Sequence, residues 1–337
     1  MAVQGLDLPK LQAYVEEHVP GTGPLTAELL HGGRSNLTYR LTDGEQTWVL
    51  RRPPLGGLTP SAHDMKREYT VVAALYGHGV PVARPIVQCE DDSVIGAPFA
   101  VVEFVDGRVI RTRDELDALT DAEVHDCAFA LIDALAALHA VDPGSVGLGS
   151  FGKAQGYLGR QVRRWYDQWT RVQTRPLPDV ETLHERLAAM TPEESGASIV
   201  HGDFRIDNAI LGPDDVTEVR ALVDWEMSTL GDPLSDLGLH IAYSDPAFDP
   251  VLAGGAAATS TRMPPADELV ARYAKTSGRD VTDWPFYLAL GYFKAAVIAE
   301  GIHARFVAGK TVGEGFETVG GAVEPLAAVG VRALGSQ

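Results

Sequence analysis

Short apolar runs separated by turn signals dominate the amino-terminal part of the chain. Residues 37–41 and 47–51 have the composition of strands, and Asp43-Gly44 between them is a hairpin signal. Apolar residues recur at helical spacing over 62–75, and residues 100–105 form one more strand-like run. This pattern predicts a small sheet accompanied by one helix.

From Thr120 onward the pattern is mostly helical. Thr120-Asp121-Ala122-Glu123 is a capping box, in which the Thr and Glu side chains satisfy backbone N–H groups at the helix start. The spacing of apolar residues also predicts helices over 157–172 and 288–307. Trp165 and Trp169 lie on the apolar stripe of the 157–172 helix, and we interpret them as packing residues rather than a ligand cage.

The clearest functional signal lies between two short apolar runs, residues 198–200 and 209–211. The string that joins them is His201-Gly202-Asp203-Phe204-Arg205-Ile206-Asp207-Asn208. A turn signal at 212–215 and a strand-like run over 219–223 follow it. A hairpin of this length would bring the next residue, Asp224, back beside Asn208.

Asp203, Asn208 and Asp224 supply what the transfer of a phosphoryl group from ATP requires. The Asp203 carboxylate can accept the proton of an attacking hydroxyl, while the oxygens of Asn208 and Asp224 can hold Mg2+ against the phosphates. Asp-x-x-x-x-Asn followed by a later Asp is the order of the catalytic and metal loops of kinases. The alternative is that Asp203, Asp207 and Asn208 only cap turns. The flanking strands and the later Asp favour the catalytic interpretation.

These motifs resemble those of the aminoglycoside phosphotransferase family, small-molecule kinases with a protein-kinase-like fold. The resemblance rests on His201-Gly202-Asp203, on Asp224-Trp225-Glu226 and on residues 231–237, and it covers about residues 25 to 310. The subgroup that looks most similar is related to the kinase-like domain fused to some acyl-CoA dehydrogenases. The runs that carry this second likeness are 49–54, 224–236 and 301–306.

The resemblance implies an α+β, two-lobed, protein-kinase-like fold. Residues 1–105 would form an N-lobe, with a small antiparallel sheet and one helix that cover the nucleotide. Residues 106–337 would form a larger helical C-lobe, with the catalytic loop, the metal loop and the acceptor-substrate pocket. The nucleotide would lie between the lobes.

Two segments of the N-lobe are candidates for contacts with ATP. The Gly-rich segment with Gly33, Ser35 and Asn36 can be the tip of a nucleotide-covering hairpin, because glycine lets backbone N–H groups approach phosphates. An ordinary β-turn is the alternative. The segment with Glu103 and Val105 resembles the linker between lobes, where backbone groups would hydrogen-bond to the adenine ring.

Arg51 is the candidate for the cation that holds the α and β phosphates. The resemblance places a Lys on this strand in many relatives, whereas this chain has Arg51 and Arg52, and strand alternation allows only one of them to face the nucleotide. Glu68 would pair with that cation, or would be a solvated surface residue. His201 is expected to order the catalytic loop, and Asp207 to cap it.

Composition excludes several other classes of function. The formal net charge is −18, from 28 basic and 46 acidic residues, which argues against a nucleic-acid footprint. It fits either a solubilising surface or a cleft that attracts a cationic substrate. We see no apolar run of the ~20 residues needed to cross a bilayer and no secretory signal. Cys89 and Cys127 lack metal spacing and are expected to be reduced in a cytoplasmic protein.

We therefore predict an ATP- and Mg2+-dependent phosphotransferase acting on a hydroxyl of a small molecule. The acceptor could be an aminoglycoside-like amino sugar, a hydroxyacyl thioester or another small alcohol. The alternative is a non-catalytic nucleotide-binding regulator on the same fold. The sequence indicates no oligomeric state. The polar candidates for the acceptor pocket, each with a fold-stabilising role as the alternative, are Asp236, Tyr243, Glu300 and His303.

Overall fold

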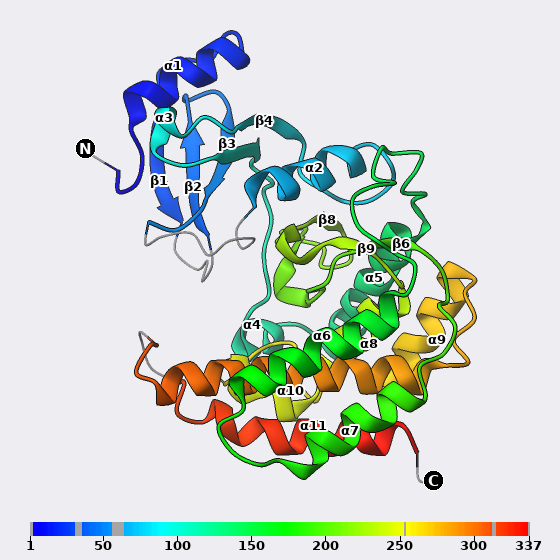
Figure 1. Cartoon of the computed structure of the whole chain (residues 1–337). Coiled ribbons are helices and arrows are strands. Elements are labelled where there is room, and N and C mark those ends of the chain that lie inside the picture. The colour runs from blue at the N-terminus through cyan, green and yellow to red at the C-terminus, as the bar shows by residue number, and fades with distance from the viewer. Residues whose placement is uncertain (1–2, 31–35, 56–63, 253, 312–314, 336–337) are drawn as a thin grey trace. The chain divides into compact units, whose positions relative to one another are not determined.

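The structure is a computed structural model that describes residues 3–30, 36–55, 64–252, 254–311 and 315–335. The chain forms two compact units. The first comprises residues 1–107 and 220–228, and the second comprises residues 108–219 and 229–337 (Figure 1). The segment 220–228, which holds Asp224, thus belongs to the first unit although it follows the catalytic-loop region in sequence.

The first unit is built on an antiparallel sheet with the strand order β1-β2-β3-β5-β4. Alternation along the central strand decides which side chains are buried: Trp48 and Leu50 enter the core, while Val49 and Arg51 are only partly buried. The strands are β1 (Thr26–Leu30), β2 (Leu37–Thr42), β3 (Thr47–Arg52), β4 (Pro85–Cys89) and β5 (Phe99–Glu103).

Helices pack against this sheet. Leu11 and Val15 of α1 (Leu8–His18) join the apolar cluster that includes Tyr39 and Trp48, and α3 (Asp92–Ile95) packs beside α1. Helix α2 (Met65–Leu75) contacts β4 and β5 and the short 3₁₀ helix η2 (Trp225–Met227). The sequence did not predict α1.

Element boundaries differ from the expected ones by a few residues. Helix α2 begins at Met65 because the Asp64 side chain caps it, accepting a hydrogen bond from the backbone N–H of Arg67 at 3.0 Å. The strand expected over 100–105 spans Phe99–Glu103. Directly after β5, the N–H of Phe104 still donates to the carbonyl oxygen of Thr47 in β3 at 3.1 Å.

The second unit is mainly helical. The predicted capping box is present, because the Thr120 side chain accepts from the Glu123 N–H and the Glu123 carboxylate accepts from the Thr120 N–H. The helix expected over 157–172 has those bounds, and the one expected over 288–307 begins earlier, at Trp284. The helices are α4 (Arg113–Asp117), α5 (Asp121–Ala140), α6 (Tyr157–Val172), α7 (Pro178–Ala189), α8 (Leu234–Tyr243), α9 (Ala266–Ser277), α10 (Trp284–Val307) and α11 (Val323–Ala333).

Short strands and 3₁₀ helices flank the catalytic-loop string. Strand β6 leads into the string and pairs antiparallel with β9, and the string ends in η1 before β7. Strand β8 then leads to the residues of the first unit that carry Asp224. These elements are β6 (Ser198–Val200), η1 (Ile206–Asn208), β7 (Ala209–Leu211), β8 (Val219–Leu222), β9 (Thr229–Gly231), η3 (Pro246–Leu252) and η4 (Val319–Ala322).

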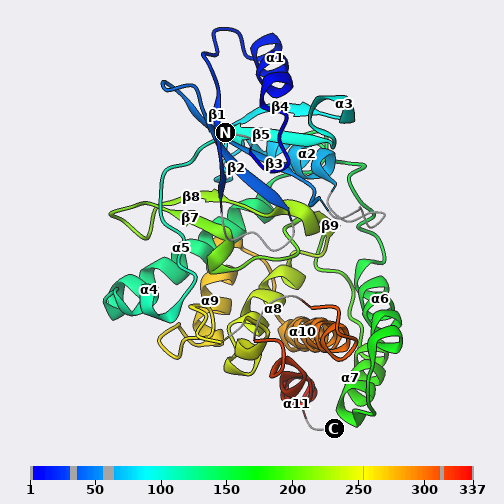
Figure 2. The ribbon, with the colours of Figure 1, turned by 90° about the vertical axis from the view of Figure 1, so that its left-hand side faces the viewer.

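Helix α10 forms the centre of the second unit. It contacts α8, α11, α6 and α7, and Figure 2 looks nearly along its axis, with α11 beneath it. Two glycines set its approach to α8: a Cβ built on Gly238 would lie 2.3 Å from the carbonyl oxygen of Tyr287, and one on Gly291 would lie 2.5 Å from that of Gly238. Backbones can approach this closely only where both positions lack a side chain. No described helix is both long and apolar enough to span a membrane.

Candidate active site

Asp203 and Asn208 are held together within the catalytic loop. The side-chain nitrogen of Asn208 donates to the backbone oxygen of Asp203 at 2.8 Å and to its Oδ2 at 3.2 Å. The backbone N–H of Asp203 donates to Nδ1 of His201 at 3.3 Å. The structure therefore brings together the three residues of the string to which the sequence assigned catalytic roles.

Asp236 of α8 fastens this loop to the helical unit. Its carboxylate accepts the backbone N–H of His201 at 2.5 Å and that of Gly202 at 2.8 Å, and it lies 3.3 Å from Nε2 of His139. Burial disfavours the ionised carboxyl, but His139, His201 and the Gly202 N–H outweigh it, so the pKa of Asp236 is lowered. Of the two roles considered for Asp236, the contacts support bracing of the loop.

A lysine that the sequence analysis missed also reaches this loop. Nζ of Lys294, on α10, donates to the backbone oxygen of Gly202 at 2.7 Å and lies 5.4 Å from the centre of the Trp165 ring. The available signal was a lone Lys within a long apolar helix. Trp169 is fully buried and Trp165 is partly buried, so both pack inside the unit.

Arg205 lies beside the two acidic side chains of the loop, Asp203 and Asp207. Its guanidinium lies 3.0 Å from Asp207 Oδ2, 3.9 Å from Asp203 Oδ1 and 5.5 Å from the centre of the Tyr243 ring. Burial raises the pKa of Asp207, against the opposing charge of Arg205. Burial and then the Asp203 carboxylate raise the pKa of the Tyr243 hydroxyl, so Tyr243 stays neutral.

A second charged cluster lies in the first unit. Arg51 pairs with Glu68 of α2 and, at 3.0 Å, with Oδ1 of Asp224. Burial works against the charged guanidinium, but Glu68 and Asp224 outweigh it and raise the pKa of Arg51. Arg52 is turned away, because it is buried and its guanidinium donates to the backbone oxygens of Gly5, Pro53 and Ile95.

Asp224 also has an unusual backbone. Its φ of 67° is the one positive φ at a non-glycine residue among the residues the structure describes. A left-handed conformation is uncommon for a residue with a side chain, although Asp tolerates it better than most. Strain of this kind gathers at functional sites. It fits a residue whose carboxylate must point in one direction.

The structure says less about the other residues that were expected to contact the nucleotide. Gly33 and Ser35 lie outside the described residues. Asn36 is 4% exposed, and neither atom of its amide has a hydrogen-bond partner in the described part of the chain. The backbone N–H of Glu103 is taken by the carbonyl oxygen of Arg84 at 2.9 Å, and its carboxylate accepts from Arg84 as well. Val105 follows in an irregular segment.

The donor set fits Mg2+. The nitrogen of the Asn208 amide is turned to Asp203, which leaves the amide oxygen as a possible ligand, and one oxygen of Asp224 is not used by Arg51. Mg2+ takes few protein ligands and completes its octahedron with waters and phosphate oxygens. Accordingly, no group of three or more His, Cys, Asp or Glu within the described ranges is needed, and none is found there. The expected meeting of Asn208 and Asp224 joins the two units and stays a prediction.

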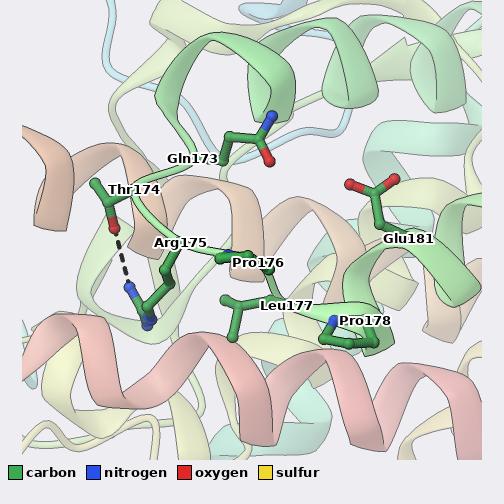
Figure 3. A pocket seen from close by; sticks show the side chains of 7 residues that line it. All are labelled: Gln173, Thr174, Arg175, Pro176, Leu177, Pro178 and Glu181. Atoms are coloured by element: carbon green, nitrogen blue, oxygen red, sulfur yellow. Dashed lines mark hydrogen bonds between the residues drawn. The ribbon is translucent and has the colours of Figure 1, made fainter.

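A pocket of about 410 Å³ lies elsewhere in the second unit (Figure 3). Three of its four polar side chains have structural partners. Arg175 and Thr174 bind the carboxylate of Glu300, and Glu181 accepts from the hydroxyl of Tyr166 and the indole of Trp169. The pocket contains none of the candidate site residues. Its lining is Gln173, Thr174, Arg175, Pro176, Leu177, Pro178 and Glu181.

Glu300 is a fold-stabilising residue. It is fully buried in α10 and accepts from the backbone N–H and hydroxyl of Thr174, both at 2.7 Å, and from Arg175 at 3.0 Å. Such a carboxylate pins the segment between α6 and α7 to the central helix. For this acceptor-pocket candidate, the contacts support the structural alternative.

Comparison with known proteins decides the family. The sequence profile of the phosphotransferase enzyme family matches residues 26–273 of the chain. The chain belongs to this family. A solved structure from Ralstonia eutropha, described provisionally as an aminoglycoside phosphotransferase, is 35% identical, covers 97% of this chain and 98% of its own, and superposes with a TM-score of 0.85. The expected resemblance and the expected kinase-like α+β fold are both confirmed.

Two further proteins are similar to this chain over nearly its whole length. Human acyl-CoA dehydrogenase family member 11 is 36% identical over 97% of this chain, and the chain spans only 43% of that relative's length. A complex of a thermostable aminoglycoside phosphotransferase APH(4)-Ia variant with AMP-PNP and hygromycin B is 14% identical, covers 97% of this chain and 99% of its own, and has a TM-score of 0.61. At that identity the likeness concerns the fold. Family membership supports phosphoryl transfer to small molecules in general.

Proposed function

We propose that this phosphotransferase uses ATP and Mg2+ to phosphorylate a hydroxyl group of a small molecule. The observation that carries the proposal is the catalytic loop. Asp203 is fixed by Asn208 on one side, and the peptide groups before it are fixed by Asp236. A carboxylate held in one direction is what positioning an acceptor hydroxyl requires.

In the proposed reaction, Asp203 orients the acceptor hydroxyl and takes its proton. A bond forms between the hydroxyl oxygen and the γ-phosphorus, and the bond from that phosphorus to the bridging oxygen breaks, so that ADP leaves. Because the transition state is loose, the proton need not move before the attack. Position and charge then supply most of the acceleration.

In this proposal, the nucleotide binds at the charged cluster of Arg51, Glu68 and Asp224. Arg51 would release Asp224 and bind the α and β phosphates, while Glu68 keeps its guanidinium in place. Asn208 and Asp224 would be the protein ligands of Mg2+. Mg2+ held by these two residues would screen the negative charge of the phosphates, and so reduce the repulsion that the incoming oxygen meets.

Two relatives bear on the choice of acceptor. The structure with hygromycin B concerns an amino sugar, and the human relative is named as an acyl-CoA dehydrogenase. We therefore keep amino sugars, hydroxyacyl thioesters and other small alcohols, with less weight on an antibiotic because of the acyl-CoA dehydrogenase likeness. The net charge of −18 does not decide between them.

The test is a screen of these three classes with MgATP, in which ADP release and the phosphorylated product are both measured. Wild type is compared with Asp203→Asn, which keeps the shape of the side chain, and with Asp214→Asn, an exposed Asp in the turn after the loop. We expect product from wild type and Asp214→Asn, and a loss of at least roughly 100-fold for Asp203→Asn. Equal turnover in all three proteins rejects Asp203 as the base. Nucleotide binding without product from any acceptor supports the regulator instead.

A further inference from the structure

Gly202 is bound through both of its backbone polar groups by charged side chains. Its N–H donates to Oδ1 of Asp236 at 2.8 Å, and its carbonyl oxygen accepts from Nζ of Lys294 at 2.7 Å. The φ of Gly202 is +82°, in the left-handed region that favours glycine. An anion and a cation from two different helices therefore fix the peptide groups on either side of this residue, directly before Asp203.

The two charged residues lie near the crossing of α8 and α10, where two glycines meet. Asp236 is close in sequence to Gly238 of α8, and Lys294 lies about one turn after Gly291 of α10. A Cβ on Gly291 would lie 2.5 Å from the backbone oxygen of Gly238. The contact of the two glycines brings both helices, and hence both charges, up to the loop.

The Lys294 ammonium is held in a defined place. It lies 5.4 Å from the centre of the Trp165 ring, and Trp165 is fixed in turn by its indole N–H, which donates to Gln161 at 3.2 Å. A cation over an indole face is attracted by the ring quadrupole. Burial lowers the pKa of Lys294, while Asp203 and Asp236 favour its charged form.

We propose that Lys294 is a positioning residue for phosphoryl transfer: its ammonium holds the Gly202–Asp203 peptide, and so aims the Asp203 carboxylate at the acceptor hydroxyl. Asp236 anchors the loop only through the N–H groups of His201 and Gly202, and on the Gly202–Asp203 peptide His201 accepts the N–H while Lys294 holds the carbonyl oxygen. A small misplacement of the reacting groups can lower the rate by ~100-fold. This inference rests on the proposed function only for its kinetic part.

The charge and the shape of Lys294 can be separated by substitution. Lys294→Met removes the ammonium and keeps a long apolar chain over Trp165, Lys294→Arg keeps a cation, and Lys294→Ala leaves room for an added alkylamine. Lys275→Met, at an exposed lysine of α9, is the matched control. Each variant is assayed for kcat and KM with MgATP and the best acceptor of the screen, or with water as the acceptor.

We expect Lys294→Met to lower kcat by roughly 10- to 100-fold with little change in the KM for ATP. Lys294→Arg should recover part of this loss, and n-propylamine should restore activity to Lys294→Ala as its ammonium form. The control should match wild type. A kcat within about twofold of wild type for Lys294→Met overturns the proposal. An equal loss in the Met and Arg variants without amine rescue also overturns it, because shape rather than charge is then responsible.

Hydrogen exchange tests the same proposal without turnover. Lys294→Met should increase backbone amide exchange in the peptide that contains residues 200–208, while Lys275→Met should not. Unchanged exchange in Lys294→Met contradicts the proposed contact. If wild type forms no ADP with any acceptor, the proposed function fails, and the exchange result still decides whether Lys294 holds the loop.

Discussion

The carboxylate of Asp236 accepts the backbone N–H of Gly202 at 2.8 Å, and this contact ties the catalytic loop to the first turn of α8. The same carboxylate accepts the N–H of His201, and Asp236 is only 2% exposed. Burying an N–H group without an acceptor, or a carboxylate without donors, costs free energy. The hydrogen bonds between Asp236 and the loop offset this cost for both partners. The direction of the loop therefore follows from a residue distant in sequence.

Replacement of Asp236 by Asn should loosen the loop. The amide offers one acceptor oxygen and places an NH2 group among donors, so one loop N–H loses its partner. We expect a loss of about 3 kcal/mol in the free energy of unfolding, because hydrogen bonds to charged groups contribute about 1.5–3 kcal/mol each. Urea denaturation measures it. Asp245→Asn, which affects the hydroxyl of Tyr292, is a comparison outside the loop. Equal stability of Asp236→Asn and wild type contradicts the bracing role.

Gly291→Ala tests the helix crossing. Ala in place of Gly in an open helix position adds up to about 1 kcal/mol of stability. At Gly291 the new Cβ would meet the backbone oxygen of Gly238 at 2.5 Å, so we expect a net loss of about 1–3 kcal/mol. The control is Gly321→Ala, where nothing lies within 4 Å of the added Cβ. Thermal unfolding of both variants gives the comparison, and a stabilised Gly291→Ala protein would show that α8 and α10 can separate at little cost.

The two neighbouring arginines should respond differently to the same change. Arg51→Lys keeps the charge but loses the fork that joins Glu68 and Asp224, and we expect nucleotide affinity to fall by roughly tenfold. Arg52→Lys should mainly lower stability, because the Arg52 guanidinium serves three backbone oxygens. Titration with a fluorescent ATP analogue and urea denaturation separate the two effects. A loss of nucleotide affinity in Arg52→Lys and not in Arg51→Lys would contradict this assignment and place Arg52 at the phosphates.

The buried side chain of His240 should make the folded protein less stable in mild acid. Burial lowers its pKa from 6.5 to about 4, and its Nδ1 lies 3.2 Å from the backbone oxygen of Phe204, to which the neutral ring donates. Between pH 6.5 and about 4, His240 therefore binds a proton in the unfolded chain but stays neutral in the folded chain. Stability is therefore present above pH 6.5 and is lost as the pH falls through about 4, by at most about 3 kcal/mol.

The control for this pH effect is His240→Asn, which keeps a donor toward Phe204 but does not titrate. Urea denaturation between pH 4 and 7 should give a smaller slope of stability against pH for the variant than for wild type, in the direction of the lowered pKa of His240. Parallel curves for the two proteins would assign the acid sensitivity to other groups.

Local sequence patterns predicted the elements that local interactions determine. The capping box at Thr120 and the helix over 157–172 depend on residues a few positions apart, and the structure has both. The role of Lys294 depends on a contact with Gly202, far away in the chain, and on glycines at a helix crossing. A single sequence, read by itself, carries no signal of a contact between residues so far apart. For the same reason Glu300 could not be assigned until its bonds to Thr174 were seen.

The central claim is that Asn208 and Asp224 hold one divalent ion. Its most direct test is a double-mutant cycle on the affinity for Mn2+, followed by electron paramagnetic resonance in the presence of AMP-PNP, with wild type, Asn208→Ala, Asp224→Ala and the double variant. We predict that each single variant weakens binding and that the pair shows a coupling energy of about 0.5–3 kcal/mol, as residues sharing one partner do. Losses that add independently, or affinities equal to that of wild type, would contradict the claim.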